Sequence, residues 1–159
     1  MKFAGLNKND FTAAPGVSVT LYTQGCPHRC QGCHNPETWD YDGGKEFTHQ
    51  DLQELLDALT ANGITRSLAI QGGEPLCIEN EFLTHFVISV VRKKVPDAKI
   101  YVWTGFLYED LLQNSSSHIQ QILEMADVLI DGPYVEELRD ITLPMRGSSN
   151  QRIINLTNQ

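Results

Sequence analysis

The order of its predicted elements constrains the fold of this chain most, because short β-branched runs alternate with longer stretches of helical periodicity. Strands are expected over residues 17–23, 67–71, 99–103, 127–131 and 152–156. Helices are expected over residues 48–61, 79–95 and 108–125, the last with an interruption at 114–117. Such alternation is typical of an α/β fold with a mostly parallel sheet and helices outside it.

Four or five βα steps are too few for a closed eight-stranded barrel. We therefore expect an incomplete (β/α) barrel of mostly parallel strands, with a flat doubly wound sheet as the second choice. In the helix over 79–95, the expected inward side chains are Phe82, Phe86, Val90 and Val91. In both architectures, functional residues gather at the carboxyl ends of the strands.

Composition limits the classes of protein that this chain can belong to. Its 159 residues, 41% of them hydrophobic, predict a single domain over 1–159, and no apolar run is long enough to cross a bilayer. A net charge of −8 with only 12 Lys and Arg residues argues against a nucleic-acid partner. The chain starts without a charged-then-apolar signal segment, so we expect a cytoplasmic protein with no membrane partner.

Three cysteines, Cys26, Cys30 and Cys33, follow the first expected strand within eight residues. Three thiolates in one loop can hold an iron–sulfur cluster and leave one iron without a protein ligand. The same spacing also fits three small apolar residues on one face of a helix. Gly25, Pro27 and Gly32 disfavour that helix and predict a tight loop.

Zinc is the main alternative cofactor, since the three cysteines with His28 or His34 supply enough ligands for a tetrahedral site. Structural zinc sites usually assemble from two separated knuckles, whereas these ligands share one loop. The remaining cysteine, Cys77, lies far along the chain and is expected to be a small buried residue. A disulfide framework is disfavoured by this arrangement of four cysteines.

A second motif, Gly72-Gly73-Glu74-Pro75, follows the second expected strand. Two glycines let a ligand approach the backbone closely, and a glutamate suits an ammonium group. On its own, the segment is equally typical of a tight strand-to-helix turn. Trp103 is expected to pack at a strand end, and Asp131 either binds a ribose hydroxyl or organises its turn. His49, His85 and His118 are expected to be solvated or satisfied by ordinary partners.

Together these two motifs resemble the signature of the radical S-adenosylmethionine enzymes, which is Cys-x3-Cys-x2-Cys with a downstream Gly-Gly-Glu-Pro segment. Within that superfamily, the chain resembles the glycyl-radical activases of anaerobic ribonucleoside-triphosphate reductase from about residue 13 to residue 155. This closer resemblance is carried by Gly25, His34, Asn35, Trp39, Trp103-Thr104-Gly105, Asp131-Gly132 and residues 146–151.

The resemblance implies a role for each matching residue. Cys26, Cys30 and Cys33 would hold a [4Fe–4S] cluster whose open iron binds S-adenosylmethionine. The amino group of that cofactor would be received by Gly72, Gly73 and Glu74, and its adenosine would lie against Gly32, Cys33 and His34. Gly32 stands where the superfamily often has an aromatic residue, so adenine packing would shift to His34 or Trp39.

The implied activity is reductive cleavage of S-adenosylmethionine to a 5′-deoxyadenosyl radical, which takes a hydrogen atom from a glycine of the large reductase subunit. No side chain need act as an acid or a base. The implied partners are that subunit and a flavodoxin or ferredoxin-type electron donor. Two other hypotheses stay open, namely a radical enzyme that modifies a small molecule, in the manner of deazaguanine synthases, and a zinc-stabilised binding module.

Overall fold

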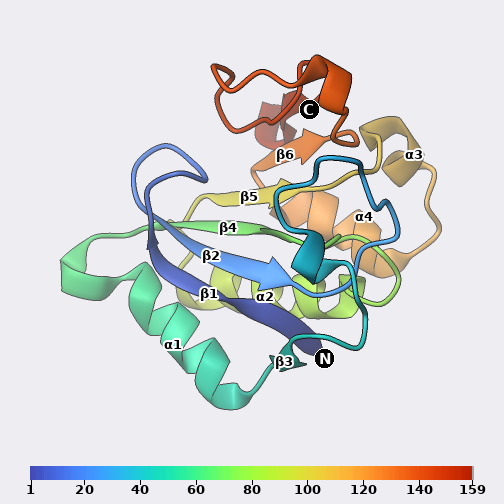
Figure 1. Cartoon of the computed structure of the whole chain (residues 1–159). Helices are drawn as coiled ribbons and strands as arrows, with labels where there is room; N and C mark the ends of the chain where they lie inside the picture. The colour runs from blue at the N-terminus through green and yellow to red at the C-terminus, as the bar shows by residue number, and fades with distance from the viewer. Residues whose placement is uncertain (159) are drawn as a thin grey trace.

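Seven strands form one sheet in the computed structural model, which describes residues 1–158 (Figure 1). The strand order is β3-β1-β2-β4-β5-β6-β7. The strands are β1 (Lys2–Asp10), β2 (Ser18–Thr23), β3 (Lys45–Glu46), β4 (Ser67–Gly72), β5 (Ile100–Trp103), β6 (Val128–Asp131) and β7 (Arg152–Asn155). The helices are α1 (His49–Leu59), α2 (Glu81–Lys94), α3 (Tyr108–Leu112) and α4 (Ser117–Met125), with 3-10 turns η1 (Pro36–Thr38), η2 (Ala61–Gly63), η3 (Glu136–Leu138) and η4 (Leu156–Asn158).

The four central strands, β2, β4, β5 and β6, run parallel, and antiparallel strands complete both edges. The predicted α/β architecture with a mostly parallel centre is therefore confirmed. Because β2 and β4 pair from Ser18↔Ser67 to Thr23↔Gly72, the segments that follow these two strands leave the sheet side by side.

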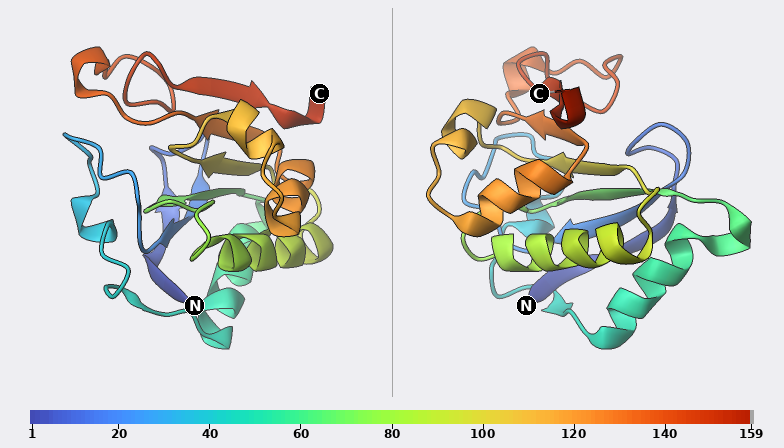
Figure 2. Two further views of the ribbon diagram at one scale, coloured as in Figure 1. Left: turned by 90° about the vertical axis from the view of Figure 1, so that its right-hand side faces the viewer. Right: turned by 180° about the vertical axis from the view of Figure 1, so that it is seen from behind.

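Helices α1, α2 and α4 lie together on one side of the sheet, away from the loops at residues 24–47 (Figure 2, left). The main core forms between these helices and every second residue of the central strands, including Leu21, Ile70, Val102 and Leu129. Alternation along a strand sends its other residues to the opposite face. There a smaller cluster gathers Ala14, Tyr101, Val128 and Ile130. No helix within residues 1–158 is long and apolar enough to cross a bilayer.

Helix α1 begins where the sequence predicts. The Thr48 hydroxyl accepts a hydrogen bond from the Asp51 amide, and the Thr48 amide donates one to the Asp51 carboxylate, which makes a capping box. The helix ends at Leu59, two residues earlier than expected. The predicted interruption of the third helix is confirmed as the gap between α3 and α4.

Two expectations need correction. The sequence pattern missed β1, because only Phe3 and Asp10 of its nine residues are buried and no apolar alternation marks it. It also misplaced part of the inner face of α2. Val91 is buried and Phe86 packs against the core as expected, but Phe82 is 51% exposed, and the other buried residues of the helix are Leu83, Thr84, Val87 and Ile88. The segment from Phe82 to Val91 is apolar on most of its circumference, so periodicity alone did not fix its orientation.

Candidate iron–sulfur and cofactor site

The cysteine loop leaves β2 as an irregular turn and closes on itself within about fifteen residues. The Gly25 amide donates to the Thr38 carbonyl at 2.7 Å, and the Cys26 amide donates to the Trp39 carbonyl at 3.2 Å. Gln24 ties the far end of the loop through hydrogen bonds from its amide nitrogen to two backbone carbonyls. No α-helix forms here among the described residues, so the predicted tight loop is confirmed.

All three loop cysteines have half-buried, unpaired thiols and line one cavity of about 530 Å³. This volume lies within the range of cofactor-binding clefts, about 300–1,000 Å³. Burial raises the pKa of the Cys26 thiol, and the backbone amides of His28 and Arg29 act in the opposite direction. A metal that binds this thiol must therefore displace a firmly held proton.

Most of the site residues expected from the sequence share this cavity. Its wall includes Cys26, Cys30, Cys33, His34, Gly72, Gly73 and Glu74. Gly32 is exposed and stands outside the wall. It has φ +82°, and a Cβ there would lie 1.8 Å from Glu136 Oε2, so the residue packs against η3 instead.

Backbone hydrogen bonds join the Gly72-Gly73-Glu74 turn to the start of the cysteine loop. The Gly73 amide donates to the Thr23 carbonyl at 2.9 Å, and the Glu74 amide donates to the Gly25 carbonyl at 2.8 Å. A Cβ on Gly73 would stand 2.3 Å from the Gly25 oxygen, so this contact requires glycine. The two motifs form one structural unit although 38 residues, 34–71, separate them in the chain.

The Glu74 carboxylate lines the cavity, but its oxygens are already bonded. Its side chain is 1% exposed and accepts hydrogen bonds from the amides of Leu76 and Gly105, the hydroxyl of Thr104 and Nε2 of His28, at 2.7–2.9 Å. These contacts account for the ordinary capacity of a carboxylate. The structure thus places Glu74 where the sequence expects it and directs its charge toward protein donors.

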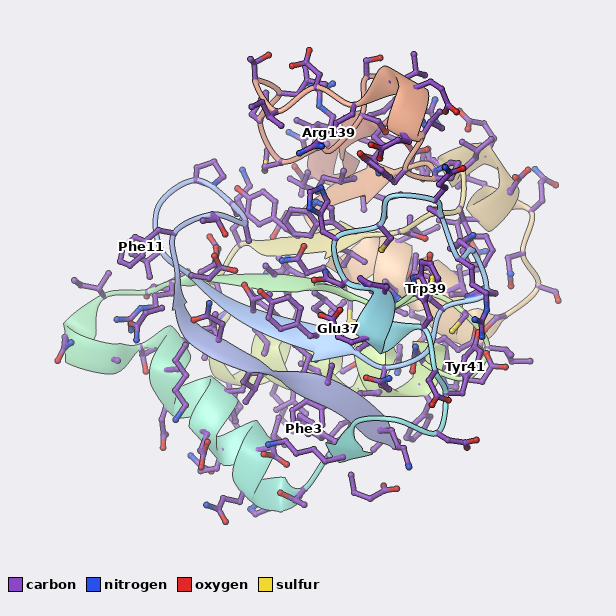
Figure 3. All side chains as sticks on the ribbon, in the orientation of Figure 1. Phe3, Phe11, Glu37, Trp39, Tyr41 and Arg139 are labelled. Atoms are coloured by element: carbon purple, nitrogen blue, oxygen red, sulfur yellow. The ribbon has the colours of Figure 1, made fainter. Side chains whose placement is uncertain are left out.

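The rest of the wall includes several aromatic side chains. Trp39 lies just after the cysteine loop with the Arg29 guanidinium 5.9 Å from its ring centre, and Tyr41, which does not line the cavity, packs beside Gly25 (Figure 3). The ring of Tyr134 meets His34 edge-on at 5.8 Å. Trp103 is held by a 2.8 Å bond from its indole nitrogen to the Met145 carbonyl. Arg146 also borders the cavity.

Comparison with known proteins identifies the family. A family model described as a 4Fe-4S single cluster domain matches residues 13–154. An anaerobic ribonucleoside-triphosphate reductase-activating protein of Enterobacteria phage T4 is 37% identical over 144 residues, which make up 91% of this chain and 87% of that relative. The chain belongs to this family of activating proteins.

Bacterial members of the activating-protein family match over similar lengths. The protein of Escherichia coli (strain K12) is 34% identical over 148 residues, 92% of this chain and 94% of its own. That of Pasteurella multocida (strain Pm70) is 32% identical over 158 residues, 99% of each chain. The predicted relationship is therefore confirmed.

The cysteine loop of this chain fits the iron–sulfur cluster that the matching family model describes. Its cysteines open onto one cavity, and a cluster spreads its thiolate ligands over several irons. The match to this family model, over residues 13–154, supports an iron–sulfur cluster over the tetrahedral zinc site considered from the sequence.

Sequence reasoning missed several wall residues of this family member. Thr104 and Gly105 carried the family resemblance but were given no role in the site, and Tyr134 was not singled out. Asp131 is fully buried and accepts hydrogen bonds from Arg152 of β7 and from the Tyr108 amide at the start of α3, so its carboxylate is occupied by protein donors. Cys77 is buried as expected. Of the three remote histidines, His49 is exposed, whereas His85 bonds Gln121 and His118 stands 3.6 Å from Glu81.

Proposed function

We propose that this protein activates an anaerobic (class III) ribonucleoside-triphosphate reductase by generating a glycyl radical on its large subunit. The observation that carries the proposal is the single cavity that brings the three loop thiols and the Gly72-Gly73 turn together. The names of the relatives, which match over nearly the whole chain, support the choice of target.

In this proposal, Cys26, Cys30 and Cys33 hold a [4Fe–4S] cluster, and S-adenosylmethionine binds beside it. When bound, the pair supplies one-electron reductive cleavage of the sulfonium cofactor. The backbone of Gly72 and Gly73, which borders the cavity, is proposed to receive the amino group of the cofactor. Glu74 contributes by holding its neighbours, since its carboxylate is fully bonded.

The adenosine end of the cofactor is proposed to lie along Cys33 and His34. His34 is exposed on its outer side and touches the ring of Tyr134, so the two rings form an aromatic edge to the cavity. We also propose that the sheet is an incomplete barrel of the radical S-adenosylmethionine type. Its parallel strands β2, β4, β5 and β6 and the cavity at their carboxyl ends support this description.

A short open architecture suits a protein substrate, because a glycine-bearing loop of the partner needs an open side through which to reach the cavity. A flavodoxin or ferredoxin-type protein is the proposed electron donor. A reducing cytoplasm is the proposed location, and four free cysteines support it.

The decisive experiment mixes anaerobically reconstituted protein, S-adenosylmethionine and a reductant with the large reductase subunit. We expect release of 5′-deoxyadenosine and a glycyl-radical doublet in the electron paramagnetic resonance spectrum of the partner. Omitting S-adenosylmethionine should remove both signals. Cofactor cleavage with no radical on the reductase, together with turnover of a small metabolite, would refute the proposed target and favour the small-molecule alternative.

A further inference from the structure

Glu74 and His28 form a buried contact between the Gly72-Gly73-Glu74 turn and the middle of the cysteine loop. Oε2 of Glu74 accepts from His28 Nε2 at 2.7 Å and from the Gly105 amide at 2.7 Å. Oε1 accepts from the Leu76 amide at 2.9 Å and from the Thr104 hydroxyl at 2.7 Å. Because a carboxylate only accepts, Nε2 of His28 carries the proton of their bond.

The imidazole of His28 is enclosed by two segments that follow two different strands. Glu74 lies after β4, whereas Gly105 and Phe106 lie after β5. The Phe106 ring meets the imidazole edge-on at 4.6 Å, and a Cβ on Gly105 would stand 2.5 Å from it. The His28 side chain is 18% exposed, so it fills a fitted slot.

This slot matters because the middle of the loop has few other attachments. Between Pro27 and Gly32, the backbone amides of His28 and Arg29 face the Cys26 thiol, and the one backbone-to-backbone hydrogen bond among the described residues runs from the Cys33 amide to the Cys30 carbonyl. All of these contacts are internal to the loop. The guanidinium of Arg29 rests over Trp39. The bond from His28 to Glu74 is thus the one side-chain hydrogen bond that ties this stretch to the body of the described protein.

We propose that Glu74 is a positioning residue for the cysteine loop, acting through His28 to hold the three thiols in place before iron enters. The proposal rests on the proposed function in one respect, since it takes Cys26, Cys30 and Cys33 as the cluster ligands. Its physical content is independent of any metal. A loop fixed at its centre samples fewer conformations, so its thiols present a prearranged ligand set.

Glutamine cannot replace Glu74 in this arrangement. Each carboxylate oxygen faces one backbone N–H, from Leu76 or from Gly105. In either orientation the amide NH2 of glutamine would meet one of these donors. Glutamine at position 28, by contrast, retains an N–H donor on a side chain of similar reach. Both Glu74→Gln and His28→Gln keep a side chain of similar size, but only Glu74→Gln disrupts the hydrogen bonds of the site. The pair therefore separates the effect of the hydrogen bond from the effect of side-chain volume.

The test measures thiol alkylation by iodoacetamide in the metal-free protein under anaerobic conditions. Trypsin cleavage at Arg29 separates Cys26 from Cys30 and Cys33, and the buried Cys77 serves as an internal reference. The variants are His28→Ala, His28→Gln, Glu74→Gln and the double variant of His28→Ala with Glu74→Gln. His49→Ala, which removes an exposed histidine at the start of α1, is the control.

Loss of a hydrogen bond to a charged group predicts about tenfold or faster alkylation of the three loop thiols in His28→Ala and in Glu74→Gln. Alkylation of Cys77 should stay within about twofold of wild type in the His28 variants, where Glu74 keeps its charge, as should every thiol in the control. His28→Gln should fall within about threefold of wild type, because the donor is restored. The double variant should react no faster than the faster single variant, because both changes remove one shared bond.

Wild-type alkylation rates in His28→Ala, or a parallel rise at Cys77, would overturn the proposal. If Glu74→Gln does not fold, the comparison of His28→Ala with His28→Gln decides alone, and equal rates in those two variants would count against the bond. Iron release to a chelator from the reconstituted proteins provides a second readout and should accelerate in the same order of variants.

The outcome is separable from that of the proposed function. A wild-type protein that carries a cluster and radicalises its partner, combined with unaltered thiol kinetics in His28→Ala, refutes only the positioning role. Accelerated thiols in a protein that never assembles a cluster refute only the proposed function.

Discussion

Replacing Gly73 with alanine tests whether the two motifs must touch. The new Cβ would lie 2.3 Å from the Gly25 oxygen and 2.9 Å from its carbonyl carbon, about 1 Å short of ordinary van der Waals contact. Both groups are backbone, so a rotamer change cannot relieve the clash. Overpacking of this kind costs ~1–3 kcal/mol. For a chain of this length, the loss corresponds to a fall of about 3–10 °C in the unfolding midpoint.

The same displacement separates the cysteine loop from the cavity wall. We expect S-adenosylmethionine affinity of the reconstituted Gly73→Ala protein to fall by up to about a hundredfold, because ~1 Å of misplacement is sufficient for such a loss. Thermal unfolding of the metal-free protein and equilibrium dialysis with the cofactor measure the two effects. Gly5→Ala is the matched control, since a Cβ there meets nothing within 4 Å. Equal midpoints and equal affinities in the two variants would refute the reasoning.

Three other predictions follow from separate parts of the molecule. Cys26→Ala, Cys30→Ala and Cys33→Ala should each abolish cluster binding, measured as iron and sulfide per chain, whereas Cys77→Ala should retain wild-type content; a full cluster in any of the first three contradicts the ligand assignment. Arg152→Ala should cost about 2 kcal/mol of unfolding free energy in urea, because it leaves the fully buried Asp131 carboxylate without its guanidinium, while Glu109→Gln at the exposed end of the same arginine should leave the midpoint unchanged. Burial, with a further contribution from Glu74, raises the pKa of Cys77 from 9.0 to about 12, so the unfolded state releases this proton at lower pH than the native state. Stability should therefore fall as pH rises from about 9 toward 12, by up to ~1.4 kcal/mol per pH unit, and urea titrations at about pH 8 and about pH 10 should give a smaller drop for Cys77→Ala than for wild type.

Local chemistry explains which parts of the fold were predictable. Short runs of adjacent residues predict the cysteine loop, the Gly72-Gly73 turn and the capped start of α1. The structure contains each of these three features where the sequence predicts it. Strand β1 carries no such signal, because it is an antiparallel strand next to the sheet edge with mostly polar, half-exposed residues.

The site was predictable to a similar degree. Glycines in the sequence indicate close approach of backbone segments, and clustered cysteines indicate metal binding. Cys26, Cys30, Cys33, Gly72 and Gly73 do line one cavity. The partners of Glu74 were not predictable, because His28, Thr104 and Gly105 reach it only through the pairing of β2, β4 and β5. Likewise, the contact of Gly32 with Glu136 depends on how the segment after β6 folds back.

The pairing of Thr23 with Gly72 at the ends of β2 and β4 has a consequence for how tolerant the chain is to changes in length. The hydrogen-bond register between β2 and β4 determines which residues of the two strands end side by side. Residues inserted in the connection that contains α1 leave this register unchanged. That connection can therefore change in length while the two motifs still meet. A single residue inserted inside either strand would turn every following side chain to the opposite face and part the motifs completely.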